Sequence, residues 1–125
     1  MPNPERLIPI YTTRGEVGAF LLYPYIYSAN GEWIGWVTAD RTVYSVHGHY
    51  VGTLSKDPRI LRRRESGQIK GRRTPPSPPK PIHPPANLPL VPQLPELMMG
   101  VIDVLEEAPH LLPSVDYGDL RDDMD

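Results

Sequence analysis

The sequence predicts an all-β domain of four β-hairpin repeats around a pseudo-four-fold axis, a small closed meander, followed by an extended proline-rich arm and one short C-terminal helix. A glycine-containing unit of nine residues recurs along the first half of the chain, and 10 of the 17 prolines lie between residues 75 and 95. Each proline removes an N–H donor and fixes φ, so this second stretch cannot form a packed helix or a central strand. We therefore expect the β domain to cover residues 1–73 and the proline-rich arm to cover residues 74–95.

The repeat is clearest at residues 27–35 (YSANGEWIG) and 44–52 (YSVHGHYVG), whose first tyrosines are 17 residues apart. Residues 11–18 (YTTRGEVG) match the same unit with one residue deleted before the second glycine, and residues 63–71 (RRESGQIKG) match it without the tyrosine. Asn-Gly and similar pairs between strand-like runs favour hairpin turns, whose central residues need positive φ. We therefore predict about eight strands, with these glycines at turns or at close approaches of the backbone: Gly15, Gly31, Gly35, Gly48, Gly52 and Gly67.

The strand expected after the second turn is apolar on both faces. Strict alternation would place Trp33 on the same face as Val37, and Ile34 on the same face as Trp36. This pattern predicts either a strand covered on both sides or an exposed aromatic patch. A single hairpin is barely stable in water, so the four hairpins are expected to share one core and to close around an axis.

The repeated pattern Y-S-x-x-G-E-W-I-G-W-V, followed by a second such unit and by R-I-L-R, resembles the bacterial four-fold beta-flower family. The resemblance covers roughly residues 8–73. It implies four hairpins around a pseudo-four-fold axis, in which Tyr11, Tyr27 and Tyr44 would be equivalent and Arg63 would take the fourth place. It implies no activity. The residues that carry it are Gly31, Trp33, Gly35, Trp36, Gly48 and Gly52.

Charge also divides the chain, since residues 1–80 carry a net charge of +6 and residues 81–125 a net charge of −8. The basic side chains gather at residues 59–73, which could bind the phosphates of nucleic acid or of anionic lipid. The segment has no aromatic residues for base stacking, which favours ion pairing with acidic groups of the tail or of a partner. The basic patch consists of Arg59, Arg62, Arg63, Arg64, Lys70, Arg72 and Arg73.

Residues 74–95 should adopt polyproline II conformation, and aliphatic side chains among the prolines favour an arm that docks on a surface over a free linker. A match to R-x-x-P-x-x-P at residues 73–79 also fits an SH3 ligand. Helical spacing of apolar residues predicts a short amphipathic helix at 96–108, and residues 109–125 form an acidic tail. The residues expected to bind protein are Trp33, Trp36, Tyr50, Ile82, Leu88, Leu90, Val91, Leu94, Leu97, Met98, Val101, Ile102 and Leu105.

Recognisable catalytic chemistry is missing from the sequence. There is no cysteine, nucleophile elbow, phosphate-binding loop or dinucleotide motif. His47 and His49 alone are too few for a metal site, so we expect no cofactor and no metal. No apolar run is long enough to cross a membrane and no signal peptide is evident, which predicts a cytoplasmic protein.

We therefore expect a non-catalytic adaptor or structural subunit, attached to a larger protein assembly through its β head and its proline-rich and helical tail. The alternative is a nucleic-acid-binding protein that uses residues 59–73 and is autoinhibited by its acidic tail. A third hypothesis, an enzyme with a central pocket lined by Tyr11, Tyr27 and Tyr44, lacks a nucleophile or a base.

Overall fold

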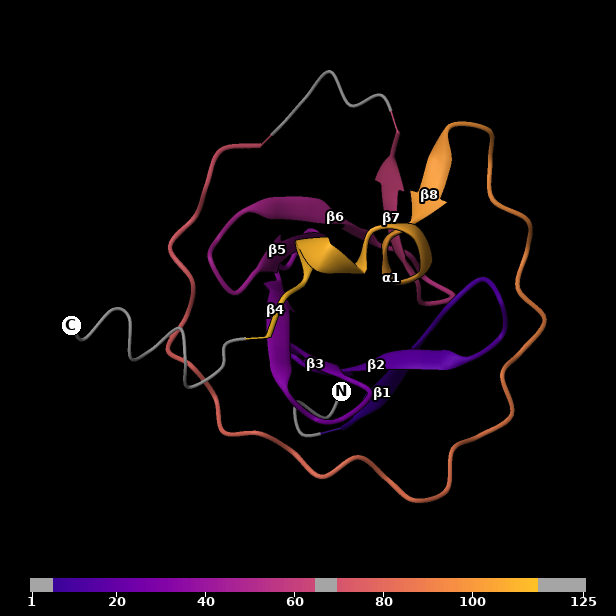
Figure 1. Cartoon of the computed structure of the whole chain (residues 1–125), viewed down its shortest axis with the longest axis horizontal. Coiled ribbons are helices and arrows are strands. Elements are labelled where there is room, and N and C mark those ends of the chain that lie inside the picture. Colours follow the sequence, from indigo (N-terminus) through magenta and orange to yellow (C-terminus); the bar gives the residue numbers. More distant parts are fainter. Residues whose placement is uncertain (1–5, 65–69, 115–125) are drawn as a thin grey trace.

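The computed structural model describes residues 6–64 and 70–114. Eight antiparallel strands form one curled sheet in which each strand pairs with the next along the chain, and one short helix follows, which confirms the predicted all-β class (Figure 1). The elements are β1 (Ile8–Tyr11), β2 (Val17–Leu22), β3 (Tyr25–Ser28), β4 (Trp33–Val37), β5 (Thr42–Ser45), β6 (Tyr50–Leu54), β7 (Ile60–Arg63), β8 (Val101–Asp103), α1 (Val104–Glu107) and a 3-10 turn at Pro109–Leu111.

A β-bulge in each of the first three hairpins determines which side chains share a face. In the β3–β4 hairpin, Ile26 lies opposite Gly35 but Tyr27 lies opposite Trp33, so that Ile34 has no partner. The extra residue puts Trp33 on the same face as Trp36, and both rings join one aromatic cluster. The prediction that Trp33 shares a face with Val37 is therefore wrong, because strict alternation does not hold across a bulge.

A bulge at the equivalent place in the first repeat shows how this unit aligns with the second. In the β1–β2 hairpin, Ile10 lies opposite Ala19 and Tyr11 lies opposite Val17, which leaves Gly18 as the unpaired residue. Ala19 thus takes the place that Gly35 has in the second unit, and Gly18 takes the place of Ile34. No residue is deleted from the first unit, contrary to the sequence prediction.

The fourth strand pair departs most from the prediction. Strand β7 pairs with β8, so that Arg62 lies opposite Ile102 and Arg63 opposite Val101. The second strand of this pair therefore comes from residues 101–103 and not from the predicted unit at 63–71, where Lys70 and Gly71 belong to no strand. The predicted turn residue Gly67 lies outside the described residues.

The predicted helix at 96–108 is also too long. Residues 96–100 are not helical, because Gly100 has a φ of +82° and the Val101 N–H bonds to the Met98 carbonyl at 3.1 Å in a turn that leads into β8. The apolar residues at 97–105 have helical spacing and so predicted a helix, but three residues of this stretch form β8, the last strand of the sheet. Within this range only Val104–Glu107 forms an α-helix, and the Asp103 carboxylate caps it by accepting the Leu105 N–H at 3.2 Å.

Among the described residues β1 and β8 do not pair, so the predicted closed meander is confirmed only as a curled sheet, whose two edges are bridged by backbone and side-chain hydrogen bonds. The Tyr11 N–H donates to the Pro58 carbonyl at 2.9 Å. Arg59, 2% exposed, donates to Asp57 at 2.6 Å and to the Thr13 hydroxyl at 3.0 Å, and that hydroxyl donates to Asp103 at 2.8 Å. Burial tends to raise the pKa of Asp57, but hydrogen bonds from Arg59 and Ser55 and the charge of Arg59 outweigh it and hold that pKa below its ordinary value.

An aliphatic core fills one face of the sheet and is covered by α1 and the 3-10 turn. Figure 1 shows α1 lying in front of the curled strands. Gly18 makes room for this cover, because a Cβ there would lie 3.0 Å from Leu105 Cδ1 and 2.8 Å from Thr12 Cγ2. The core consists of Ile10, Ala19, Leu21, Ile26, Ile34, Val37, Val43, Val51, Leu54, Ile60, Val104, Ala108 and Leu112.

We predict that Gly18→Val destabilises the protein by about 1–3 kcal/mol through overpacking against Leu105. Leu105→Ala alone loses packing on the core, but in the double variant the two changes compensate, with a coupling of about 1 kcal/mol. Denaturant unfolding of the four proteins measures the cycle. Strictly additive losses would mean that Leu105 does not pack on Gly18.

Candidate interaction surface

An aromatic cluster occupies the face of the sheet opposite the aliphatic core. Trp36 and Tyr44 stack with ring centroids 4.9 Å apart, and Tyr25 meets Trp33 edge-on at 6.2 Å. The indole N–H groups donate to backbone carbonyls, Trp33 to Gly35 at 2.7 Å and Trp36 to Ser45 at 3.1 Å. Tyr27 and Tyr44 are buried in this cluster and pack against its other members. The buried members are Phe20, Tyr27, Trp33, Trp36, Tyr44 and Val46.

Residues 70–100, called the connecting segment below, contain no helix or strand and run around the outside of the sheet (Figure 1). The segment first meets the hairpin turn at Gly48, whose carbonyl accepts the Arg73 N–H at 2.9 Å. A Cβ on Gly48 would lie 1.9 Å from the Arg73 carbonyl oxygen. The Arg73 guanidinium lies over the rings of Trp36 and Tyr44, at 5.9 and 5.7 Å from their centroids.

The segment meets the next hairpin turn, at Gly31, in the same way. The Gly31 carbonyl accepts the Ile82 N–H at 3.0 Å, and a Cβ on Gly31 would lie 1.9 Å from the Ile82 carbonyl oxygen. Between the two turns, the Tyr25 hydroxyl donates to the Ser77 carbonyl at 3.0 Å, and Ile82 packs on the aromatic cluster. The chain therefore covers part of its own aromatic face. The polyproline II conformation expected for residues 74–95 stays a prediction.

The predicted basic patch is divided among several roles within the chain. Arg59 belongs to the buried bridge described above, and Arg73 to the aromatic cluster. Arg62 donates to the carbonyls of Tyr50 and Val51 at 3.3 and 3.1 Å. Arg72 and Lys70 also bond within the chain, to the His47 carbonyl at 2.7 Å and to the Thr42 hydroxyl at 3.1 Å.

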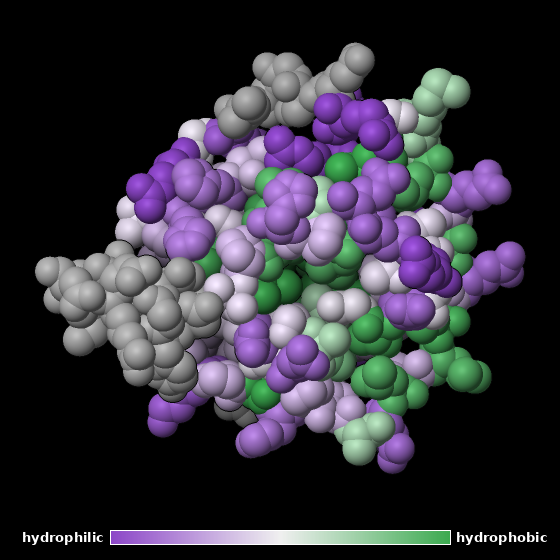
Figure 2. Space-filling model, in the orientation of Figure 1, coloured by the Kyte–Doolittle hydropathy of each residue, from purple (hydrophilic) through white to green (hydrophobic). Residues whose placement is uncertain are grey.

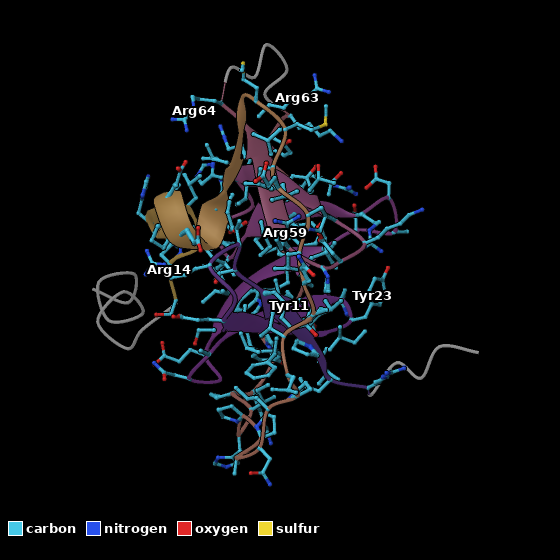
Figure 3. The ribbon with its side chains drawn as sticks, turned by 90° about the vertical axis from the view of Figure 1, so that its right-hand side faces the viewer. Tyr11, Arg14, Tyr23, Arg59, Arg63 and Arg64 are labelled. Carbon is cyan, nitrogen blue, oxygen red and sulfur yellow. The ribbon has the colours of Figure 1, made fainter. Side chains whose placement is uncertain are left out.

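Arg63 and Arg64 are both exposed and lie at one end of the molecule. Figure 3 shows the two side chains at the outer end of the β7–β8 pair, whereas Arg59 lies well inside. Arg64 reaches the Glu107 carboxylate at 3.2 Å in an ion pair whose two side chains are mostly in solvent. Such exposed pairs contribute little to stability, so Arg64 could exchange this partner at small cost.

Exposed large apolar side chains gather at the same end and along the last part of the connecting segment. Leu90 is 96% exposed, Met98 is 79% exposed and Met99 fully so, while Leu88 is half exposed. In Figure 2, green hydrophobic side chains follow the right-hand edge, where Figure 1 draws this part of the segment. Scattered apolar residues are ordinary on a surface, but exposed apolar side chains concentrated in one segment indicate an interaction site.

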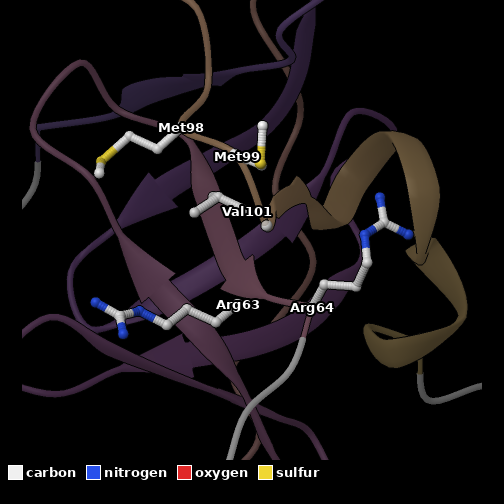
Figure 4. Close-up of a pocket in the computed structure, with 6 residues that line it drawn as sticks. Arg63, Arg64, Met98, Met99 and Val101 are labelled. Atoms are coloured by element: carbon white, nitrogen blue, oxygen red, sulfur yellow. The ribbon is translucent and has the colours of Figure 1, made fainter.

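A shallow pocket of about 560 Å³ lies where the methionines meet the arginines (Figure 4). Its walls are Arg63 and Arg64 from the end of β7, and residues 98–101 from the turn before β8. Two backbone hydrogen bonds hold this turn, from Val101 to Met98 at 3.1 Å and from Arg64 to Gly100 at 2.7 Å. The exposed side chains therefore project from a fixed backbone.

The residues predicted to bind protein fall into four groups. Trp33, Trp36, Tyr50 and Ile82 lie in or against the aromatic cluster, while Ile102 and Leu105 pack on the aliphatic core. Leu88, Leu90 and Met98 are exposed, and Val91, Leu94, Leu97 and Val101 are half-buried. Sequence reasoning missed Met99 and Tyr25, since neither helical spacing nor the repeat singles them out.

Among the described residues, no group of three or more His, Cys, Asp or Glu side chains could hold a metal ion. The Asp40 carboxylate accepts hydrogen bonds from Thr38 and Thr42, which lower its pKa. None of the helices in the described ranges is long and apolar enough to span a membrane.

These features define a small all-β protein of hairpin repeats whose own chain covers the aliphatic face of its sheet and part of the aromatic face. The profile of the 4-fold beta flower proteins matches residues 8–100, and the chain belongs to this family. The match reaches through the connecting segment, beyond the residues on which the sequence resemblance rests. No curated protein and no solved structure matches the chain.

The glycines with positive φ in the first three hairpin turns provide a matched test of the contacts with the connecting segment. Gly15 has open space around its Cα, whereas Gly31 and Gly48 meet carbonyl oxygens of the segment. We predict that Gly15→Ala costs about 1 kcal/mol from positive φ alone. Gly31→Ala and Gly48→Ala should each cost at least about 1 kcal/mol more, because a hydrogen bond is also displaced.

Urea unfolding measures the three losses, and limited proteolysis reads out release of the segment. Cleavage within residues 74–95 should accelerate in the Gly31 and Gly48 variants but not in the Gly15 variant. Equal losses and equal cleavage in all three would show that the segment does not depend on these contacts.

Proposed function

We propose that the chain is a non-catalytic binding protein, an adaptor that attaches to a protein partner through the surface formed by residues 88–99 and the end of β7. The observation that carries this proposal is the distribution of exposed apolar side chains. Within the described part of the chain, four of the five exposed large hydrophobic residues lie between Leu88 and Met99. Apolar groups concentrated in this way are typical of protein-binding surfaces.

The division of the connecting segment supports the same proposal. Its first half is used within the chain, since Arg73, Ser77 and Ile82 contact the sheet. Its second half carries Leu90, whose side chain is almost wholly in solvent. Attachment through a segment that is already anchored at both ends loses less conformational entropy than attachment through a free tail.

Affinity purification of the tagged full chain from its native cells tests the proposal. A stoichiometric protein should co-purify with the wild type, and its yield should fall about tenfold with Leu90→Ser/Met98→Ser/Met99→Ser. Tyr23→Ser, which removes the remaining exposed large hydrophobic residue elsewhere, is the matched control and should retain the partner.

Thermal unfolding confirms that each variant is folded, which we expect because all four side chains are exposed. The same yield from the triple variant and the wild type would contradict the proposal, as would a loss that the control variant shares.

A further inference from the structure

We infer that the partner presents an acidic segment with apolar side chains to the surface formed by Arg63, Arg64, Met98 and Met99. This inference rests on the proposed function and names the chemistry that this surface would recognise.

The two arginines are available to a ligand at small cost. Five of the seven basic residues at 59–73 bond or stack within the chain as described above, and the Arg64 side chain makes a sixth contact, an exposed ion pair with Glu107. Arg63 and Arg64 project at the outer end of the β7–β8 pair (Figure 3). A guanidinium presents several N–H donors in a plane, which matches the two oxygens of a carboxylate.

An apolar wall lies next to these two charged side chains. Met98 and Met99 form the opposite wall of the same pocket (Figure 4). Methionine is flexible and polarisable, and it adapts to apolar side chains of different shapes. A ligand that satisfies both walls must carry carboxylates and apolar groups together.

The lining of the pocket suits an acidic peptide better than nucleic acid. Single-stranded nucleic acid binds to basic grooves with aromatic side chains on which bases stack. The aromatic cluster here is buried, and the pocket is lined by arginine, methionine, glycine and valine. The pocket therefore lacks stacking platforms but offers apolar contacts, which favours an acidic peptide.

The backbone of this surface is held in place before a ligand binds. The Met98–Gly100 turn is fixed by its two backbone hydrogen bonds, and Arg64 gives up only an exposed ion pair with Glu107 on binding. Little ordering is needed before a ligand can bind, so the cost of association is mainly that of the partner.

A random peptide library displayed on phage tests the inference. The library is selected on the full wild-type chain after depletion on the full chain carrying Arg63→Ser, Arg64→Ser, Met98→Ser and Met99→Ser. We expect the enriched peptides to combine Asp or Glu with Leu, Ile, Phe or Met. Enriched peptides of any other composition, or no peptide that distinguishes the two proteins, would overturn the inference.

The enriched peptide is then labelled with fluorescein and its binding is measured by anisotropy. Met98→Ser/Met99→Ser and Arg63→Ser/Arg64→Ser should each weaken binding about tenfold, whereas the exposed basic pair changed in Lys56→Ser/Lys80→Ser should leave it unchanged. A labelled oligo(dT) is the nucleic-acid probe. If oligo(dT) binds more tightly than the peptide, and only the arginine variant weakens it, the surface recognises nucleic acid and the inference is wrong.

The two proposals can fail separately. If the cellular partner is lost with Leu90→Ser/Met98→Ser/Met99→Ser but the library gives no acidic apolar peptide, the binding surface stands and only the chemistry of the partner is wrong. If no cellular protein depends on those residues, the proposed function itself fails.

Discussion

A sheet with two apolar faces must be covered twice, and the rest of this structure depends on that constraint. Burial of apolar area is the main favourable term in folding, and a domain of about 65 residues has little to spare. The chain covers the aliphatic face with α1 and part of the aromatic face with the connecting segment. The connecting segment runs from β7 to β8 and α1 follows β8 directly, so the two covers lie on either side of β8 in the sequence.

The repeated bulge explains how a symmetric pattern yields an asymmetric molecule. In each of the first three units the bulge leaves one residue unpaired beside the tyrosine of the repeat, and this residue is Ile34 in the second unit and Val51 in the third. Gly18 stands at this position in the first unit and leaves space that Leu105 fills. At Gly18, the departure from the repeat is therefore the place where Leu105 of α1 packs against the sheet.

The local features of the fold could be predicted from the sequence, because turns and strands are determined by neighbouring residues. Gly31 and Gly48 identify their hairpins through the need for positive φ. The pairing of β7 with residues 101–103 could not be predicted, since three residues carry no distinctive period and their partner lies far away in sequence. The same limit affects the surface: Arg59 and Arg63 look alike in a basic run, yet one is buried in an ion pair and the other is exposed.

The central claim is that the connecting segment is held to the hairpin turns by backbone contacts at two points. Amide hydrogen exchange of the full chain, followed by NMR, tests it most directly. The amides of Arg73 and Ile82 should exchange much more slowly than those of Ser77 and Lys80, for which the described residues provide no acceptor. Equal and fast exchange at all four amides would contradict the claim, because the segment would then lie free of the sheet.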